Sequence, residues 1–341
     1  MAVERVVVIG ASAGGVAALE LLVGGLPADF PAAVLIVLHI AATQKSLLAG
    51  ILSRAGPLRA APAMDGAPLR AGHIYVAVAD HHLMVERDRI KVTRGPKENH
   101  FRPSIDVLFR SAAYYFGARA IGVVMSGALS DGSSGLFAIK RLGGLAVIQD
   151  PDEALYSSMP LSALSRVDVD YGLPAAEIGA LLSGLTKQPP PRSEPLDAAH
   201  YRKDLKADVD IAAADSAFER GIMEYAKPSA YTCPECHGVL FRIEEGKHDR
   251  FRCHTGHGFT TAALLDGCTV SVEATLWEAV KSLQETVALL NESAQKLREN
   301  GDEAGADALQ QQAVEAKSRL STLRVFALDH AALNADVEET E

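Results

Sequence analysis

The chain has 341 residues, of which 48% are hydrophobic and 22% are charged, so it is long enough for two or three globular domains. Its formal net charge of −10 argues against a general nucleic-acid binder and against docking on anionic lipid, because both partners require a basic surface. No basic leader precedes a long apolar stretch, and no run of about 18 apolar residues occurs. We therefore expect a cytoplasmic protein with no signal peptide and no membrane insertion.

Residues 1–186 alternate short apolar runs with amphipathic stretches, which predicts an α/β domain with a parallel, doubly wound sheet and helices on both faces. Near-continuous Val, Ile and Leu runs are typical of parallel strands, because these strands are buried on both faces. The predicted strands are residues 5–10, 33–38, 120–125 and 145–149, and the predicted helices are 16–23, 45–53, 104–115 and 134–141. Ser104 is placed to cap the third helix. A hairpin is expected from residues 73–78 and 83–86, followed by a strand at 89–93.

The composition changes after residue 186, where four prolines fall among residues 187–200. We predict a linker with room for a helix over 187–228 and a cysteine-containing module over 229–267. Over 268–336, apolar residues step alternately by four and three in two stretches around the break at 300–305. This spacing predicts an antiparallel helical hairpin, whose many alanines bury little area and need a further surface.

The first predicted strand ends in a turn of small residues, GASAGG, with Ser12 between glycines 10, 14 and 15. A tight strand-to-helix turn exposes the serine side chain, and the free N–H groups of the following helix can stabilise an anion. The same turn resembles a dinucleotide phosphate loop, but such a fold needs an acid after the second strand. His39 stands there instead, and it favours a hydrolase because it can act as a general base.

A histidine that activates a serine needs a third group to orient it. Asp131 follows the predicted strand 120–125 in a Ser/Gly-rich loop, at the same edge of the sheet as Ser12 and His39. Asp80 is a weaker candidate because it follows a predicted hairpin strand, and Asp106 is weaker because an acid early in a helix complements the dipole. The remaining histidines of this region are expected on the exposed surface: His73, His81, His82 and His100.

These residues stand in motifs that together resemble the catalytic domain of the CheB-type protein-glutamate methylesterases of bacterial chemotaxis. The motifs occur in order as VIGASAGG, IVLHI, DGAPLRAGHIYVAVADHHL, FRPSIDVLFRSAA, GVVMSGALSDGSSGLFAIKRLGG and VIQDPDEALYSSMP. The resemblance implies a bacterial enzyme that hydrolyses glutamyl methyl esters of a receptor protein to glutamate and methanol. Some members of the family also deamidate glutamine.

Carried onto this sequence, the resemblance implies Ser12 as nucleophile, His39 as base and then acid, and Asp131 as the orienting carboxylate, with no cofactor for catalysis. We expect the backbone N–H groups of Ala13 and Ala128 to bind the oxyanion. Both positions depart from the family, where many relatives carry threonine and methionine. The relatives also carry a phosphorylation-controlled receiver domain ahead of the catalytic part, and because the first strand begins within ten residues, we expect neither that domain nor its control.

The cysteines form a second motif, Cys233-x-x-Cys236 followed by Cys253 and His257. Two such pairs separated by a predicted hairpin are typical of a structural, tetrahedral Zn²⁺ site with Cys₃His ligation, which would stabilise a module too small for its own core. His254 and His237 are alternative fourth ligands, and a CxxC redox pair is the alternative function. Cys268 lies outside the pattern and is expected to be a plain thiol.

Two classes of function follow from these motifs. The first is an active methylesterase whose partners are a methylated receptor and, through the C-terminal tail, a methyltransferase or regulatory protein. The second is a non-catalytic signalling scaffold that keeps the fold and binds partners through the zinc module and helices. A nucleotide-dependent reductase is weaker, since only the glycine-rich turn supports it. The complete set of Ser12, His39 and Asp131 favours the esterase, because a scaffold does not need all three.

Overall fold

The computed structural model describes residues 3–44, 46–190, 198–213, 217 and 219–340. It divides into two compact units, Met1–Leu264 and Leu265–Glu341. The predicted boundaries at residues 186, 228 and 267 stay predictions. The stretch predicted as a linker falls partly on 191–197, outside the described residues.

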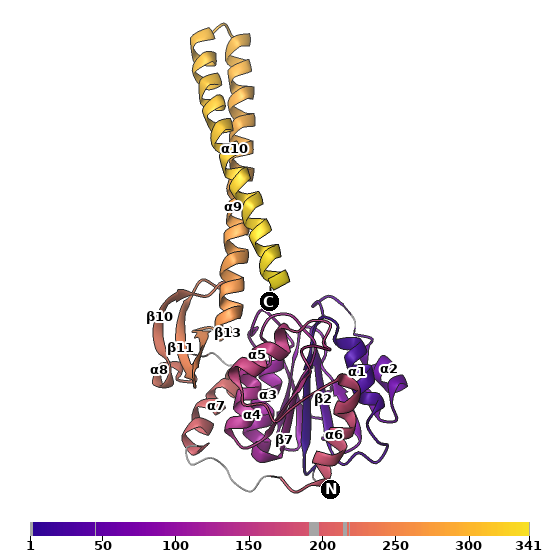
Figure 1. The fold of residues 1–341 in the computed structure, drawn as a ribbon. Helices are drawn as coiled ribbons and strands as arrows, with labels where there is room; N and C mark the ends of the chain where they lie inside the picture. Colours follow the sequence, from indigo (N-terminus) through magenta and orange to yellow (C-terminus); the bar gives the residue numbers. More distant parts are fainter. Residues whose placement is uncertain (1–2, 45, 191–197, 214–216, 218, 341) are drawn as a thin grey trace. The chain divides into compact units, whose positions relative to one another are not determined.

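A seven-stranded parallel sheet lies at the centre of the first unit (Figure 1), which confirms the predicted parallel α/β architecture. In spatial order its strands are β3 (Arg59–Pro62), β4 (His73–Val76), β2 (Ala33–Leu38), β1 (Val6–Ala11), β7 (Ala120–Val124), β8 (Leu145–Gln149) and β9 (Tyr171–Leu173). Every residue of the three central strands is buried, as expected for strands covered on both faces. The order places the ends of β1, β2 and β7 next to one another.

Helices cover both faces of this sheet. One face carries α1 (Gly15–Gly24), α2 (Leu48–Ala55) and α6 (Ala175–Lys187). The other face carries α3 (Ile105–Phe116), a 3₁₀ turn (Gly117–Arg119), α4 (Ser133–Arg141) and α5 (Ser158–Arg166). Each face has its own apolar core, since the side chains of a central strand such as β2 alternate between them: Leu35 and Val37 on the second face, Val34 and Ile36 on the first.

The predicted hairpin of residues 73–78 and 83–86 is wrong. β4 instead pairs in parallel with β2 and β3 within the main sheet. The hairpin is formed by β5 (His82–Glu86) and β6 (Arg89–Thr93), which are separated by two residues. A two-residue connection suits a tight hairpin, whereas five residues separate β4 from β5 and let β4 remain in the buried sheet.

The rest of the first unit begins with α7 (Ala198–Ala212), which packs on α3, and the short α8 (Ile222–Tyr225). A four-stranded antiparallel ribbon follows, made of β10 (Lys227–Thr232), β11 (Val239–Glu245), β12 (His248–Cys253) and β13 (Gly258–Thr260). We call residues 227–260 the ribbon module. The two strands expected between the cysteine pairs are β11 and β12.

The second unit is a pair of long helices, α9 (Thr261–Glu299), whose first residues belong to the first unit, and α10 (Glu303–Thr340). The predicted alternate four-and-three steps coincide with the buried and half-buried positions, among them Val280, Ala294, Ala306 and Ala313. The predicted helices are thereby confirmed. Within the described part of the chain, no helix is both long and apolar enough to cross a membrane.

Candidate active site

Ser12 lies in the turn between β1 and α1, at the carboxyl edge of the sheet. Its backbone N–H donates to the carbonyl of Ser126 after β7 (2.9 Å), and its carbonyl accepts from the N–H of Gly15 (3.0 Å). Gly14 between them has a φ of 70°, a left-handed conformation that glycine adopts without strain. A Cβ at Gly127 would lie 2.8 Å from the Cβ of Ser12, so only glycine leaves room for this serine.

His39 follows β2, the parallel neighbour of β1, and its N–H donates to the carbonyl of Ala11 (3.2 Å). This pairing brings the imidazole Nδ1 to 3.2 Å from the Oγ of Ser12. The ring stacks on Phe101 with a centroid distance of 3.6 Å and an interplanar angle of 9°. Only 4% of the His39 side chain is exposed, so the ring is fixed by packing as well as by hydrogen bonds.

Asp131 follows β7 on the other side of β1 and is 1% exposed. Its Oδ2 lies 2.9 Å from the Nε2 of His39, which completes a chain of contacts from Ser12 through His39 to Asp131. A carboxylate accepts hydrogen bonds, so this contact assigns the ring proton to Nε2 and leaves the Nδ1 lone pair facing Ser12. In that tautomer His39 can take the hydroxyl proton.

The Asp131 carboxylate also occupies the N-terminus of α3. It accepts the backbone N–H groups of Ile105 (2.7 Å) and Asp106 (3.2 Å), where the helix dipole favours a negative charge. Ser104 stands at the N-cap, but its hydroxyl makes no capping bond and donates to Asp131 instead (3.0 Å). The predicted capping role of the Ser104 side chain is therefore wrong. Burial opposes ionisation of Asp131, yet its hydrogen bonds, first the one from His39, hold the pKa of the carboxyl below its ordinary value.

Asp106, the weaker candidate, lies close to this site and is fully buried. Its oxygens accept from the N–H of Gly135 at the start of α4 (2.6 Å) and from the Nδ2 of Asn99 (2.9 Å). Burial, and next the charge of Asp131, raise the pKa of Asp106 to about 7. Of the two neighbouring carboxyls, Asp131 therefore ionises first, and it is the one that touches His39.

Asp80 has a different partner. It lies beyond β4, which belongs to the main sheet, so the prediction that Asp80 follows a hairpin strand was wrong. Its carboxylate pairs with Arg102 (2.6 Å) and Arg94 (2.6 Å), and the hydrogen bond from Arg102, more than any other contact, holds its pKa below the ordinary value. These arginines keep Asp80 away from the imidazole and place it in the pocket wall.

An open pocket of about 400 Å³ lies over Ser12 and His39. Its remaining walls are apolar after β2 and polar or aromatic on the opposite side: Ile40, Ala41, Ala42, Asp80, Lys97, His100, Phe101 and Arg102. Ala13 follows Ser12 directly, and Ala128 is an exposed residue of the loop after β7. Among the described residues, neither backbone N–H donates to a protein acceptor.

The profile of the CheB methylesterase family matches residues 7–182, which contain this whole site. The chain belongs to the CheB methylesterase family. A curated relative from Leptospira interrogans is 39% identical over 176 residues, which are 51% of this chain and 91% of that protein. The crystal structure of the Thermotoga maritima CheB methylesterase catalytic domain superposes with a TM-score of 0.51 at 31% identity and covers 53% of this chain and 98% of that one.

Other relatives are longer. A protein from Anaeromyxobacter dehalogenans named protein-glutamate methylesterase/protein-glutamine glutaminase 2 is 40% identical over 183 residues, or 54% of either chain. The chain therefore spans about half the length of that relative. The family profile ends at residue 182, before the ribbon module and the helices α9 and α10.

The ribbon module brings Cys233, Cys236, Cys253 and His257 together, with their ligand atoms all within 4.8 Å of one another. The alternatives His237 and His254 are not in this group. Cys268 is exposed, in α9, and is not a member of this group. A metal ion could be held by this cluster, because thiolate sulfur and imidazole nitrogen are the ligands of protein zinc sites.

One of the histidines expected at the surface is fully buried. The Nε2–H of His82 donates to the carbonyl of Pro96 (2.8 Å), and its Nδ1 accepts the N–H of Ser104 (3.2 Å). Burial lowers its pKa. The prediction of an exposed His82 was wrong because its ring is enclosed between Pro96 and Ser104, whereas His73, His81 and His100 are half-buried.

Sequence reasoning also missed Asn99 and Phe101, which contact Asp131 and His39 directly. Both lie in the irregular segment between β6 and α3, where the polar sequence KENH is typical of an ordinary loop. Their positions depend on a fold that brings this loop to the residues after β2 and β7, and no local pattern encodes those contacts.

Proposed function

We propose that the chain is a serine hydrolase that removes methyl esters from glutamate side chains of a receptor protein in the bacterial cytoplasm and releases methanol. The observation that supports this proposal most strongly is the continuous contact from Ser12 through His39 to the buried Asp131, at the base of an open pocket. An ester carbonyl requires a nucleophile, a proton shuttle and oxyanion donors. Ser12 and His39 can supply the first two, and backbone N–H groups beside them can supply the third.

In this proposal His39 Nδ1 takes the proton of Ser12 as the Oγ attacks the ester carbonyl. Asp131 stabilises the imidazolium through Nε2–H. The tetrahedral intermediate collapses, the C–O bond to the methoxy group breaks, and His39 returns its proton to the leaving oxygen, which departs as methanol. Water then attacks the acyl-serine with His39 as base, and the free glutamate side chain and Ser12 are restored.

The backbone N–H groups of Ala13 and Ala128 are the proposed oxyanion donors. Ala13 adjoins the nucleophile at the start of α1, where the N-terminal N–H groups carry partial positive charge. Because both donors belong to the backbone, alanine at these positions keeps the N–H that the oxyanion needs. The same donors would bind a glutamine amide carbonyl, so deamidation with release of ammonia is proposed as a slower second reaction.

The form of the pocket supports a protein substrate. It is open, and the side next to His39 is lined by Ile40, Ala41 and Ala42, which suit the methylene groups of a glutamyl side chain. A side chain that projects from a helix surface could enter such a pocket without unfolding of the substrate.

We further propose that Cys233, Cys236, Cys253 and His257 bind one structural Zn²⁺. Tetrahedral zinc with bonds of about 2.3 Å to sulfur and about 2.0 Å to nitrogen separates its ligand atoms by roughly 3.5–3.8 Å. The Sγ atoms of Cys236 and Cys253 are 3.7 Å apart, and Nδ1 of His257 lies 3.6 Å and 3.7 Å from those of Cys253 and Cys233. These three separations fit tetrahedral zinc, the other ligand atoms lie within 4.8 Å of one another, and four protein ligands would leave no open position for catalysis.

The test is methanol release from a methylated cytoplasmic fragment of a bacterial chemoreceptor. Wild type is expected to release methanol, and Ser12→Ala is expected to release none above the uncatalysed rate. Exposed Ser165→Ala serves as the matched control. Release that persists in Ser12→Ala would refute the assignment, and no release by wild type beside an active reference esterase would refute the substrate.

A further inference from the structure

The loop between β6 and α3 reaches two members of the proposed catalytic set. Asn99 is 2% exposed, and its Nδ2 donates to Asp131 Oδ1 (2.9 Å) and to Asp106 Oδ2 (2.9 Å). Two residues later, Phe101 stacks on the ring of His39. This loop therefore contacts both the carboxylate and the imidazole and contributes to their orientation.

The ribbon module holds the same loop from its other side. The backbone N–H of Thr260 in β13 donates to the Oδ1 of Asn99 (2.8 Å), and the N–H of Asn99 donates to the carbonyl of Gly258 (2.8 Å). The Thr260 hydroxyl also lies 2.7 Å from the hydroxyl of Ser130, the neighbour of Asp131. The Asn99 carboxamide thus links β13 at one end to the catalytic acid at the other.

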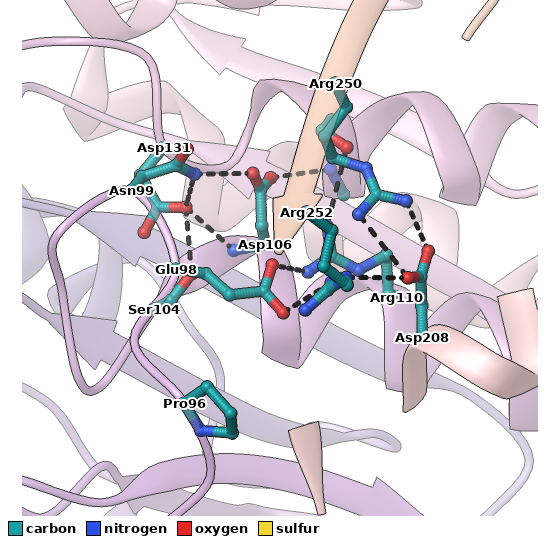
Figure 2. Close-up of polar contacts among 12 residues, drawn as sticks. Pro96, Glu98, Asn99, Ser104, Asp106, Arg110, Asp131, Asp208, Arg250 and Arg252 are labelled. Atoms are coloured by element: carbon teal, nitrogen blue, oxygen red, sulfur yellow. Dashed lines mark hydrogen bonds and ion pairs between the residues drawn. The ribbon is translucent and has the colours of Figure 1, made fainter. Parts of the chain in front are cut away.

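A buried ion network fixes the ribbon module at this place (Figure 2). Arg252 is 0% exposed, and it pairs with Glu98 (2.8 Å) beside Asn99 and with Asp208 of α7 (3.0 Å). Glu98 also pairs with Arg110 of α3, and Arg250 pairs with Asp208. Burying such charges costs free energy unless all their partners are present, so the network strongly favours one position of β12 and β13 relative to Glu98 and Asp208.

The Cys/His cluster stands directly before β13. Cys253 ends β12, His257 immediately precedes β13, and the N–H of Cys253 donates to the carbonyl of His257 (3.0 Å). A metal bound there would tie the turn between β12 and β13 to the Cys233–Cys236 turn. Each of the three residues of β13 pairs with β12, and Phe259 packs with Cys233 and Cys253 in one apolar cluster. A metal bound to these cysteines would therefore help to hold β13 in position.

We propose that Asn99 is a positioning residue for Asp131 and that β13 sets the orientation of the Asn99 side chain. Metal binding at the Cys/His cluster thereby switches the esterase between an ordered and a loosened active site. This inference rests on the proposed function only for the identity of the reaction. The Cys/His cluster and its connection through Asn99 to Asp131 do not depend on which ester is hydrolysed. Asn99 does not line the pocket, so its effect should appear in kcat and in the pH profile, with little change in KM.

The first experiment substitutes Asn99→Ala in the metal-loaded chain. The titratable groups that face Asp131 are His39 after β2, Asp106 in α3 and His82 in β5. Loss of the Asn99 hydrogen bond raises the Asp131 pKa, so we expect kcat to fall at least about tenfold, KM to stay within about threefold, and the acid limb of the profile to move to higher pH. Asn300→Ala is the matched control, because it makes the same change at an exposed asparagine between α9 and α10. An unchanged profile in Asn99→Ala, or an equal loss in Asn300→Ala, would overturn the positioning role.

The second experiment removes the metal from the full chain with a chelator, verifies its loss by elemental analysis, and measures the rate at which Ser12 reacts with a fluorophosphonate. We expect this rate to fall at least about tenfold and to recover when Zn²⁺ is added back, while the far-UV circular dichroism of the chain is retained. A reaction rate that does not change on metal loss, or a purified chain that binds no metal, would overturn the switch. A metal-dependent Ser12 rate without methyl-ester turnover would refute the proposed substrate and leave this inference standing.

Discussion

Replacing Asp131 with asparagine changes one atom of the site and should nearly abolish its activity. Four donors converge on Oδ1 of Asp131, from the side chains of Asn99 and Ser104 and the N–H groups of Asp106 and Gly132. The amide oxygen of the variant must therefore occupy the Oδ1 position, and its NH₂ group must occupy the Oδ2 position. There the NH₂ donates to His39 Nε2 and forces the proton onto Nδ1, which can then no longer accept the proton of Ser12.

The magnitude follows from the loss of the general base with the geometry retained. A wrong tautomer of this kind costs about 10³–10⁴ in kcat, which equals about 4–5.5 kcal/mol of transition-state stabilisation. The NH₂ group also faces the N–H of Ile105, which donates to Oδ2 at 2.7 Å in the wild type. A buried donor without an acceptor costs about 1–3 kcal/mol, so the variant should be less stable and still folded.

The assay is single-turnover methyl-ester hydrolysis at pH 7, with urea unfolding of the same preparation. Asp168→Asn is the matched control, because this exposed carboxylate undergoes the same change of one atom far from a buried network. Activity of Asp131→Asn within tenfold of wild type would refute the assigned tautomer and the role of Asp131.

Three further substitutions test other parts of the structure. Arg252→Met leaves Glu98 and Asp208 buried without this cation and should lower the free energy of unfolding by about 3–5 kcal/mol in urea titrations. As the control, Arg242→Met removes one side of an exposed ion pair and should lower the free energy of unfolding by less than about 1 kcal/mol. In the folded protein Asp106 keeps its proton to about pH 7, whereas an unfolded aspartate loses it near pH 4. Between about pH 4 and pH 7 the folded state therefore binds more protons than the unfolded state, so the free energy of unfolding falls as the pH rises. Asp106→Asn should remove that slope, by up to about 1.4 kcal/mol per pH unit, and equal slopes would contradict the raised pKa. Gly127→Ala places a methyl group against Ser12 and should lower kcat about 10–100-fold in the methanol assay, with an unchanged kcat disproving the tight fit.

The central strands were predictable because their physics is local. Val6–Ala11 and Ala33–Leu38 are apolar throughout, and burial on both faces of a parallel sheet requires that pattern. Ser12, His39 and Asp131 each follow one of three adjacent strands, so the shared edge of the sheet brings them together. The heptad positions of α9 and α10 were predictable for the same reason, since the side-chain period of a helix is fixed by its geometry.

The predictions that were wrong concern residues whose pairing or burial is determined by tertiary contacts. The strand His73–Val76 has the same local pattern in a hairpin as in the main sheet, and only its pairing with Ala33–Leu38 distinguishes the two. Ser104 has the expected N-cap position, yet its hydroxyl binds Asp131, which is 27 residues away in sequence. Asn99 is bound by Asp131 and by Thr260, which is 161 residues away, and no pattern in a single sequence reports contacts of that range.

The central claim is that Ser12 is a nucleophile activated by His39. Reaction of the full chain with a fluorophosphonate, followed by peptide mapping, tests it without any assumption about the substrate. The account predicts a single label on Ser12 and a rate at least about 100-fold lower in His39→Ala, which lacks the base. Equal rates in the two proteins, or a label that maps to another residue, would contradict it.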